Sequence, residues 1–153
     1  MAVAPRRLRV RRRAHGIDHV TITTRDTRAA KRFYELALQP LGYSVVFDWP
    51  DGGRAYLALP AEPSCLWLAQ SADPGPVALS LAAADRAEVD AFYAAAVAAG
   101  AQPRSLPSPR PEYTAKTYAA EVVDLDGNAI QVICWHADLS ETERAEGAAE
   151  KAA

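Results

Sequence analysis

Residues 17–42 read IDHVTITTRDTRAAKRFYELALQPLG, and residues 76–100 read PVALSLAAADRAEVDAFYAAAVAAG. Each stretch begins with alternating apolar and polar residues, passes through an aspartate, and ends in a segment whose apolar residues are three or four positions apart. The aspartates, Asp26 and Asp85, each precede a Phe-Tyr pair by seven and eight residues, and they are 85 − 26 = 59 positions apart. The chain therefore contains an internal repeat of a strand followed by a helix.

The two aspartates stand where helix caps are expected. A short carboxylate accepts hydrogen bonds from the unpaired N–H groups of a first helical turn. Glu88 lies three residues after Asp85 and completes a capping box. Gly100 stands where the end of a helix favours a left-handed residue. The apolar stripes of the two helices, which contain Phe33 and Phe92, are predicted to be core.

Three short extended runs follow each helix. The turn at residues 124–127, Asp-Leu-Asp-Gly, joins the last two runs. The order of elements predicts two consecutive βαβββ units, module one at 17–70 and module two at 76–136. The predicted runs are 43–49, 54–60 and 64–69 in the first unit, and a weaker run at 101–107, then 117–124 and 128–135, in the second.

We therefore expect an α+β fold in which two tandem βαβββ modules form a curved, half-open mixed sheet around a central cavity, with the helices outside. The single domain is predicted at 16–137. Residues 1–14 carry six arginines and no acid, so residues 1–15 are predicted to be a basic, disordered tail. Residues 138–153 are predicted to be a frayed helix or a disordered tail.

Composition limits the classes of function. Half of the 153 residues are apolar, but no run of 18 apolar residues exists, which argues against a membrane span. The two cysteines, Cys65 and Cys134, lie in apolar stretches and fit neither a CxxC metal motif nor a disulfide framework. We expect reduced thiols and a cytoplasmic protein.

The repeat, the IDHV opening and the closing DLDGN turn before an apolar strand resemble the vicinal oxygen chelate superfamily. That superfamily includes glyoxalase I, extradiol dioxygenases and bleomycin-resistance proteins. The likeness covers about residues 17 to 136, and the stretch at 89–93 resembles the small bacterial glyoxalase-like members. The resemblance implies a divalent metal held by inward His, Gln or Glu side chains, which would polarise vicinal oxygens of a substrate.

Carried over position by position, the implied metal site is degenerate. His19 occupies the first ligand position, but its partner in the second module, at 19 + 59 = 78, is Ala78. Gln131 stands where the family usually has a glutamate, and the remaining position offers Cys65 or Trp67. Catalytic sites normally use three protein ligands, often including a carboxylate. No cofactor is therefore expected, and a divalent metal is the alternative.

Strand alternation predicts which side chains line the cavity. His19 is either a general base or a hydrogen-bonded pocket histidine. The Pro-rich segment that contains Tyr113 is either a lid, with Arg104 or Arg110 able to meet an anionic substrate, or a plain connection. Each aromatic residue alone also fits a core role. The predicted ligand-binding residues are Arg54, Tyr56, Trp67, Ser80, Tyr113, Tyr118 and Gln131.

Three functions remain open at this stage. The first is a glyoxalase-like protein that binds or sequesters a small organic ligand, or is weakly catalytic, without a metal. The second is a metal-dependent lyase, isomerase or dioxygenase that uses His19 and Gln131. The third is an interaction module whose active part is the arginine tail, although nucleic acid is not expected as a partner. A homodimer is expected, and an exchange of modules between chains is conceivable.

Overall fold

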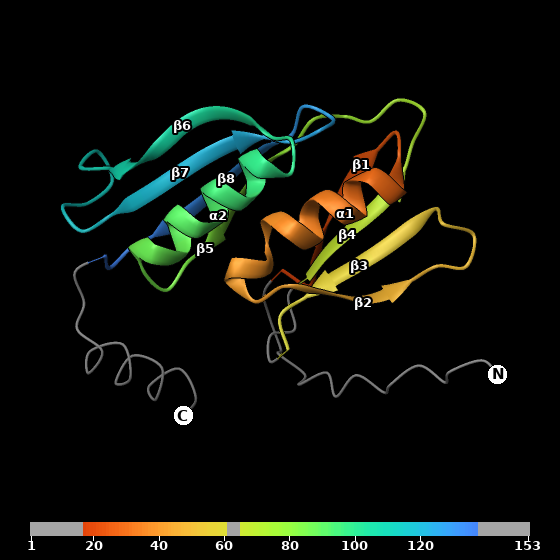
Figure 1. Cartoon of the computed structure of the whole chain (residues 1–153), viewed down its shortest axis with the longest axis horizontal. Helices are drawn as coiled ribbons and strands as arrows, with labels where there is room; N and C mark the ends of the chain where they lie inside the picture. Colours follow the sequence, from red (N-terminus) through yellow and green to blue (C-terminus); the bar gives the residue numbers. More distant parts are fainter. Residues whose placement is uncertain (1–16, 61–64, 138–153) are drawn as a thin grey trace.

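The computed structural model describes residues 17–60 and 65–137, except for the side chain of Cys65 (Figure 1). The predicted tails at 1–15 and 138–153 lie outside the described residues. No helix in the described part of the chain is long and apolar enough to cross a membrane. In chain order the elements are β1 (His19–Thr24), α1 (Thr27–Ala37), the 3₁₀ helix η1 (Gln39–Leu41), β2 (Ser44–Asp48), β3 (Arg54–Ala58), β4 (Cys65–Gln70), β5 (Ala78–Ala82), α2 (Arg86–Ala98), β6 (Gln102–Pro109), β7 (Tyr118–Val123) and β8 (Ala129–Cys134).

The strands form two four-stranded mixed sheets of matching topology, which confirms the predicted pair of βαβββ modules and the α+β class. The first sheet has the order β1-β4-β3-β2 and the second the order β5-β8-β7-β6. In each sheet the first strand pairs in parallel with the last, and the other pairs are antiparallel. The sheets are open, because their edges do not close into a barrel.

The strand registers confirm that the two modules repeat one pattern. β1 begins at His19 and β5 at Ala78, an offset of 78 − 19 = 59. His19 pairs with Cys65 at the start of β4, and Ala78 pairs with Ala129 at the start of β8. His19 and Ala78 therefore hold equivalent places in the two sheets, as the sequence repeat predicts.

Both helices begin at the predicted aspartates. Asp26 accepts a hydrogen bond from the Ala29 N–H at 3.0 Å, and Asp85 accepts one from the Glu88 N–H at 2.9 Å. The carboxylate of Glu88 accepts in return from the Ala84 N–H at 2.7 Å, one residue before the cap. These contacts satisfy N–H groups that a helix start leaves without an intrahelical partner.

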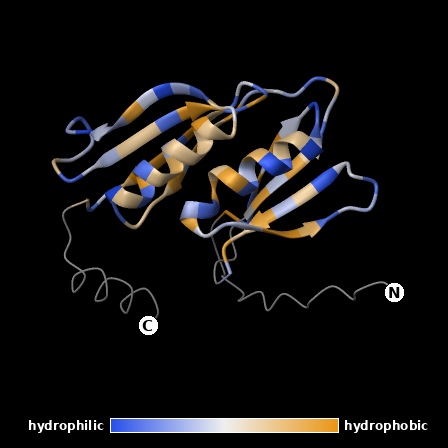
Figure 2. Ribbon diagram, in the orientation of Figure 1, coloured by the Kyte–Doolittle hydropathy of each residue, from blue (hydrophilic) through white to orange (hydrophobic). Residues whose placement is uncertain are grey.

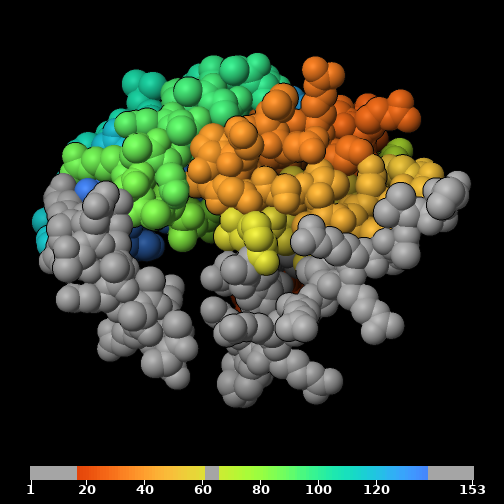
Figure 3. Space-filling view, turned by 60° about the horizontal axis from the view of Figure 1, so that its bottom comes forward, coloured from red at the N-terminus to blue at the C-terminus, as the bar shows by residue number. Residues whose placement is uncertain are grey.

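One hydrophobic core joins the two modules. It contains Phe33 and Phe92 as predicted, together with side chains from both helices and from the helix-facing side of both sheets. The helices pack against each other and lie on the same side of the sheets (Figure 1). Hydrophobic and hydrophilic positions alternate around α1 (Figure 2), and the two modules are in close contact (Figure 3).

Polar contacts also cross between the modules at the β7–β8 turn. The hydroxyl of Tyr34, on α1, donates to Asp124 at 2.5 Å, and Tyr34 is only 1% exposed. In the same turn, the carboxylate of Asp126 accepts from the hydroxyl of Thr24 and from the backbone N–H of Arg25. The β7–β8 turn is thus hydrogen-bonded both to the end of β1 and to the middle of α1.

The Pro-rich segment differs from the prediction. It was expected to be a weak extended run followed by a loop, but residues 102–109 form β6, the longest strand. Pro103 and Pro109 are accommodated because β6 is an edge strand, where a missing N–H costs no hydrogen bond on the open side. The register also shifts twice along the β6–β7 pair. The connecting loop is therefore limited to residues 110–117.

Candidate functional site

Each sheet turns one face to its helix and leaves the opposite face open. On that open face, directly paired strand positions form one row of side chains across each sheet, and the two rows are equivalent in the repeat. The row of the first sheet is Thr21, Trp67, Tyr56 and Phe47. The row of the second sheet is Ser80, Gln131, Glu121 and Ser105. The first row is mainly aromatic and the second is polar.

Trp67 lies at the centre of an aromatic cluster on the first sheet. The ring of His19 stacks on Trp67 with centroids 4.7 Å apart and an interplanar angle of 25°. Trp49 and Tyr56 lie 5.5 Å and 5.9 Å from the same ring. The guanidinium of Arg54 lies 5.5 Å from the centroid of Trp49, within the range of a cation–π contact. The structure therefore brings together the predicted residues of the first module.

His19 is held from two sides. Its Nδ1 lies 2.9 Å from a carboxylate oxygen of Asp18, and its ring is stacked on Trp67. The imidazole is still 40% exposed. The indole N–H of Trp67 is buried without a hydrogen-bond partner among the described residues. This face therefore offers aromatic surface and the cation Arg54, whereas the indole N–H of Trp67 is buried beneath it.

The second module contains a pocket of about 350 Å³, at the lower end of the range for small-molecule sites. The hydroxyl of Ser80 donates to the amide oxygen of Gln131 at 2.8 Å. The rings of Tyr113 and Trp135 lie 5.8 Å apart at 54°. The lining residues are Ser80, Ala82, Tyr113, Gln131, Ile133 and Trp135.

Tyr113 reaches this pocket from an anchored loop. The backbone N–H of Arg110 donates to the Thr117 carbonyl at 2.8 Å, and that of Tyr113 donates to the Arg110 carbonyl at 3.0 Å. The guanidinium of Arg110 contacts the hydroxyl of Ser105. The guanidinium of Arg104 lies 3.2 Å from the carboxylate of Glu121. Both arginines that were expected to meet an anionic substrate are therefore engaged within the protein.

Tyr118 lies on the opposite face of the second sheet from the other predicted pocket residues. It is the first residue of β7, and its hydroxyl donates to Asp90 of α2 at 2.9 Å. The guanidinium of Arg86 lies 5.0 Å from the centroid of its ring. Desolvation, followed by the hydrogen bond and charge of Asp90, raises the pKa of Tyr118. We therefore leave Tyr118 out of the candidate site, because strand alternation directs it toward the helix.

Three residues of these faces were missed in the sequence. Phe47 and Trp49 join the aromatic cluster, and a β-bulge between Val45 and Phe47 shifts the alternation that would have revealed them. Glu121 pairs directly with Gln131 on the neighbouring strand. Its position between the buried Ala120 and Val122 was a usable signal, because a residue between two helix-facing ones faces the open side.

The side chains do not fit a metal ion of the kind that the family resemblance implies. No three His, Cys, Asp or Glu side chains of residues 17–60 and 65–137 form a group able to hold one. The oxygen of Gln131 already accepts from Ser80, and the carboxylate of Glu121 faces Arg104. Within one chain, His19 lies on the other sheet. We therefore derive no chemical step through a metal.

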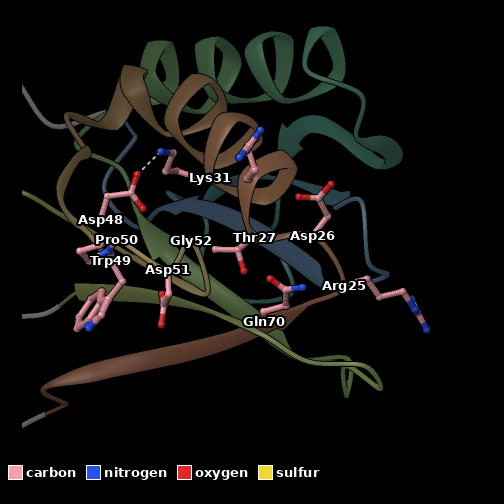
Figure 4. Close-up of a pocket in the computed structure, with 11 residues that line it drawn as sticks. Arg25, Asp26, Thr27, Lys31, Asp48, Trp49, Pro50, Asp51, Gly52 and Gln70 are labelled. Atoms are coloured by element: carbon pink, nitrogen blue, oxygen red, sulfur yellow. Dashed lines mark hydrogen bonds and ion pairs between the residues drawn. The ribbon is translucent and has the colours of Figure 1, made fainter.

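A larger cavity, of about 800 Å³, lies beside the start of α1 (Figure 4). Several of its charged groups contact one another or the backbone: Lys31 points toward Asp48, and Asp51 accepts from the Gly53 N–H at 2.9 Å. Asp26 caps the helix. Because Lys31 and the acidic groups of this cavity already have partners, and because the second sheet combines polar groups with exposed aromatic rings, we place the candidate site on the open face of the second sheet.

Comparison with known proteins identifies the family. Residues 16–132 match the Glyoxalase/Bleomycin resistance protein/Dioxygenase superfamily. The chain belongs to this superfamily. Among solved structures, a glyoxalase/bleomycin resistance protein from Albidiferax ferrireducens T118 is 26% identical, with a TM-score of 0.66 over 77% of this chain and 98% of that one.

Two further solved structures share the fold at lower identity. The lactoylglutathione lyase from Agrobacterium tumefaciens is 21% identical, with a TM-score of 0.58 over 78% of this chain and 92% of that one. TioX from Micromonospora sp. ML1 is 15% identical, with a TM-score of 0.60 over 78% and 98%. No curated protein matches the chain. Membership of the superfamily is thus established, and the chemistry has to be argued from the site.

Proposed function

We propose that this member of the glyoxalase/bleomycin resistance/dioxygenase superfamily is a cytoplasmic protein that binds and sequesters a small organic molecule without a resident metal ion. The observation that carries the proposal is the second-module pocket. It combines a hydrogen-bonded polar pair, Ser80 and Gln131, with the exposed aromatic rings of Tyr113 and Trp135. Apolar walls with a few polar groups are the usual composition of a small-molecule site.

The aromatic face of the first module extends this proposal. Phe47 is 39% exposed, and Trp135 on the second module is 46% exposed. We propose that a second copy of the chain covers both faces, so that the aromatic row of one copy lies opposite the polar row of the other. His19, Arg54, Tyr56 and Trp67 then contact the ligand from across the dimer. A symmetric pair is the commonest way to cover such surfaces.

The test of the proposal is elemental analysis of the purified protein, followed by a thermal-unfolding screen against a library of small ring compounds. The screen is run in EDTA and again with added zinc, nickel, manganese or iron. We expect less than one metal ion per chain and a ligand that raises Tm equally in both conditions, because ligand binding to the native state alone stabilises it.

A matched pair of variants locates the binding. Trp135→Ala is expected to abolish the rise in Tm, and Tyr118→Phe, on the other face of the same sheet, is expected to leave it unchanged. One bound metal per chain, together with a metal-dependent activity that His19→Ala abolishes, would support the metal-dependent alternative instead. A library without any stabilising compound would argue against the proposed function.

A further inference from the structure

The residues that line the second-module pocket indicate the chemistry of its ligand. The polar pair and the apolar pair beside it are fixed by strand register: Ser80 pairs with Gln131, and Ala82 pairs with Ile133 two positions along the same strands. Trp135 and Tyr113 also line the pocket. The floor is therefore polar at one position and apolar at the next, with aromatic rings among the walls.

The polar pair leaves unused hydrogen-bonding capacity. The hydroxyl of Ser80 donates to the amide oxygen of Gln131, so the hydroxyl keeps its lone pairs as acceptors. The amide N–H₂ group of Gln131 has no hydrogen-bond partner among residues 17–60 and 65–137. If the amide is turned over, its N–H₂ group donates to Ser80, and the hydroxyl proton and the amide oxygen are left instead. Either orientation offers a ligand at least one donor and one acceptor.

The walls limit the charge and shape of the ligand. No Asp, Glu, Lys, Arg or His is among the residues that line this pocket. A charged group resting on these residues would lose hydration without an opposite charge among them, so the part of the ligand that enters this pocket should be neutral, and any charge should lie on the side that meets the partner copy. The indole and phenol rings favour a flat partner, because aromatic rings gain most from stacked or edge-on contact.

We propose that this pocket selects an uncharged planar ring that carries a primary or secondary amide, or a lactam. Its N–H donates to the acceptor of the Ser80–Gln131 pair, its carbonyl accepts from the donor of that pair, and its ring packs on Trp135. This inference deepens the proposed function and rests on it.

Four probes built on one benzene ring test the proposal. Benzamide carries both a donor and an acceptor, N,N-dimethylbenzamide lacks the donor, benzoate is an anion without a donor, and benzamidine is a cation without an acceptor. Dissociation constants are measured from the backbone amide shift of Ile133 during titration. We expect wild type to bind benzamide about three- to tenfold more tightly than the other three, the range of one net hydrogen bond.

Substitutions of the polar pair provide the sharper result. Gln131→Glu keeps the shape but replaces the donor with an anionic acceptor, so the preference should change from benzamide to benzamidine. Ser80→Ala should reduce the preference for benzamide. Tyr118→Phe, on the other face of the same sheet, should change nothing. Circular dichroism and Tm show that each variant is folded.

The outcomes separate this inference from the proposed function. If all four probes bind alike and Trp135→Ala abolishes their binding, the amide selection is wrong and the pocket still binds small molecules. If no probe binds but a library compound does, the ligand class is wrong. If neither a probe nor a library compound binds, both proposals fail.

Discussion

Tyr34 is the residue through which the two modules share a polar contact in the core. Its hydroxyl is buried and donates to Asp124, which also accepts from the Asn128 backbone and side chain. Tyr34→Phe is expected to lower the free energy of unfolding by about 1–3 kcal/mol, since Asp124 loses a buried donor. The control is Tyr93→Phe at the equivalent place in the repeat, which should cost less in urea unfolding.

The same contact predicts a dependence on pH. Burial, followed by the charge and hydrogen bond of Asp124, raises the pKa of Tyr34 well above its ordinary value in the folded state. An unfolded tyrosine releases its proton near pH 10, so the stabilisation is complete below about pH 10 and falls at higher pH. Urea unfolding between about pH 8 and pH 11 should show a shallower loss of stability in Tyr34→Phe than in wild type. Equal losses would contradict this role.

Strand alternation predicted that Ser80 and Gln131 share one face, and the two residues are paired in the second sheet; their role as ligand contacts stays a prediction. Alternation did not reveal the contact of Tyr34 with Asp124, because the two are separated by 90 positions. The repeat also places Tyr34 and Tyr93 at equivalent positions, so it gave no reason to expect different contacts for the two hydroxyls. Tyr118 was predicted as a ligand contact because it lies beside the Pro-rich loop, but it is the first residue of β7 and its hydroxyl donates to Asp90 of α2.

Among the elements, the end of α2 depends on a glycine. Gly100 has a φ of +108°, a conformation that L side chains rarely adopt. Gly100→Ala should therefore destabilise the protein by about 1–3 kcal/mol. Gly75→Ala is the matched control, since Gly75 has no positive φ and a Cβ there meets no atom within 4 Å. Thermal unfolding measures both, and equal Tm values would show that the glycine is not required.

Helices were predicted better than the edge strand. An aspartate marks the start of α2, a glycine marks its end, and an apolar stripe marks its buried face. All three signals lie within the helix or directly beside it in the sequence. Prolines in residues 102–109 argued against regular pairing, but β6 forms because the rest of the sheet provides β7 as its partner. Position in a sheet depends on topology, so proline content alone could not predict it.

At the scale of the whole molecule, the shared core predicts one cooperative unfolding transition. Phe92 of module two is 1% exposed, so Phe92→Ala should cost about 3–5 kcal/mol. The substitution is made in a Trp135→Phe background, which leaves Trp49 and Trp67 as the tryptophans of the chain. Their fluorescence then reports on module one alone. Its midpoint should fall together with that of the far-ultraviolet circular dichroism signal. An unchanged midpoint for module one would mean that the modules unfold separately.

The family and the paired modules followed from the repeat, whereas the packing of the modules on each other did not. The helix–helix contact joins segments whose starts are 86 − 27 = 59 positions apart, and the bonds of Asp126 to Thr24 and Arg25 span 102 and 101 positions. Nothing in a single sequence shows which of several module arrangements buries the helices best. The contrast between an aromatic row and a polar row appears only once the registers are known.

Mapping the binding site of the best library compound by NMR tests the central claim most directly. The ¹⁵N-labelled protein is kept in EDTA, and its amide and indole signals are followed during the titration. We predict that the signals of Gln131, Ile133 and Trp135 move first and furthest. Shifts confined to the cavity beside α1, at residues 25–31 and 48–52, or shifts that appear only after a divalent metal is added, would contradict the account.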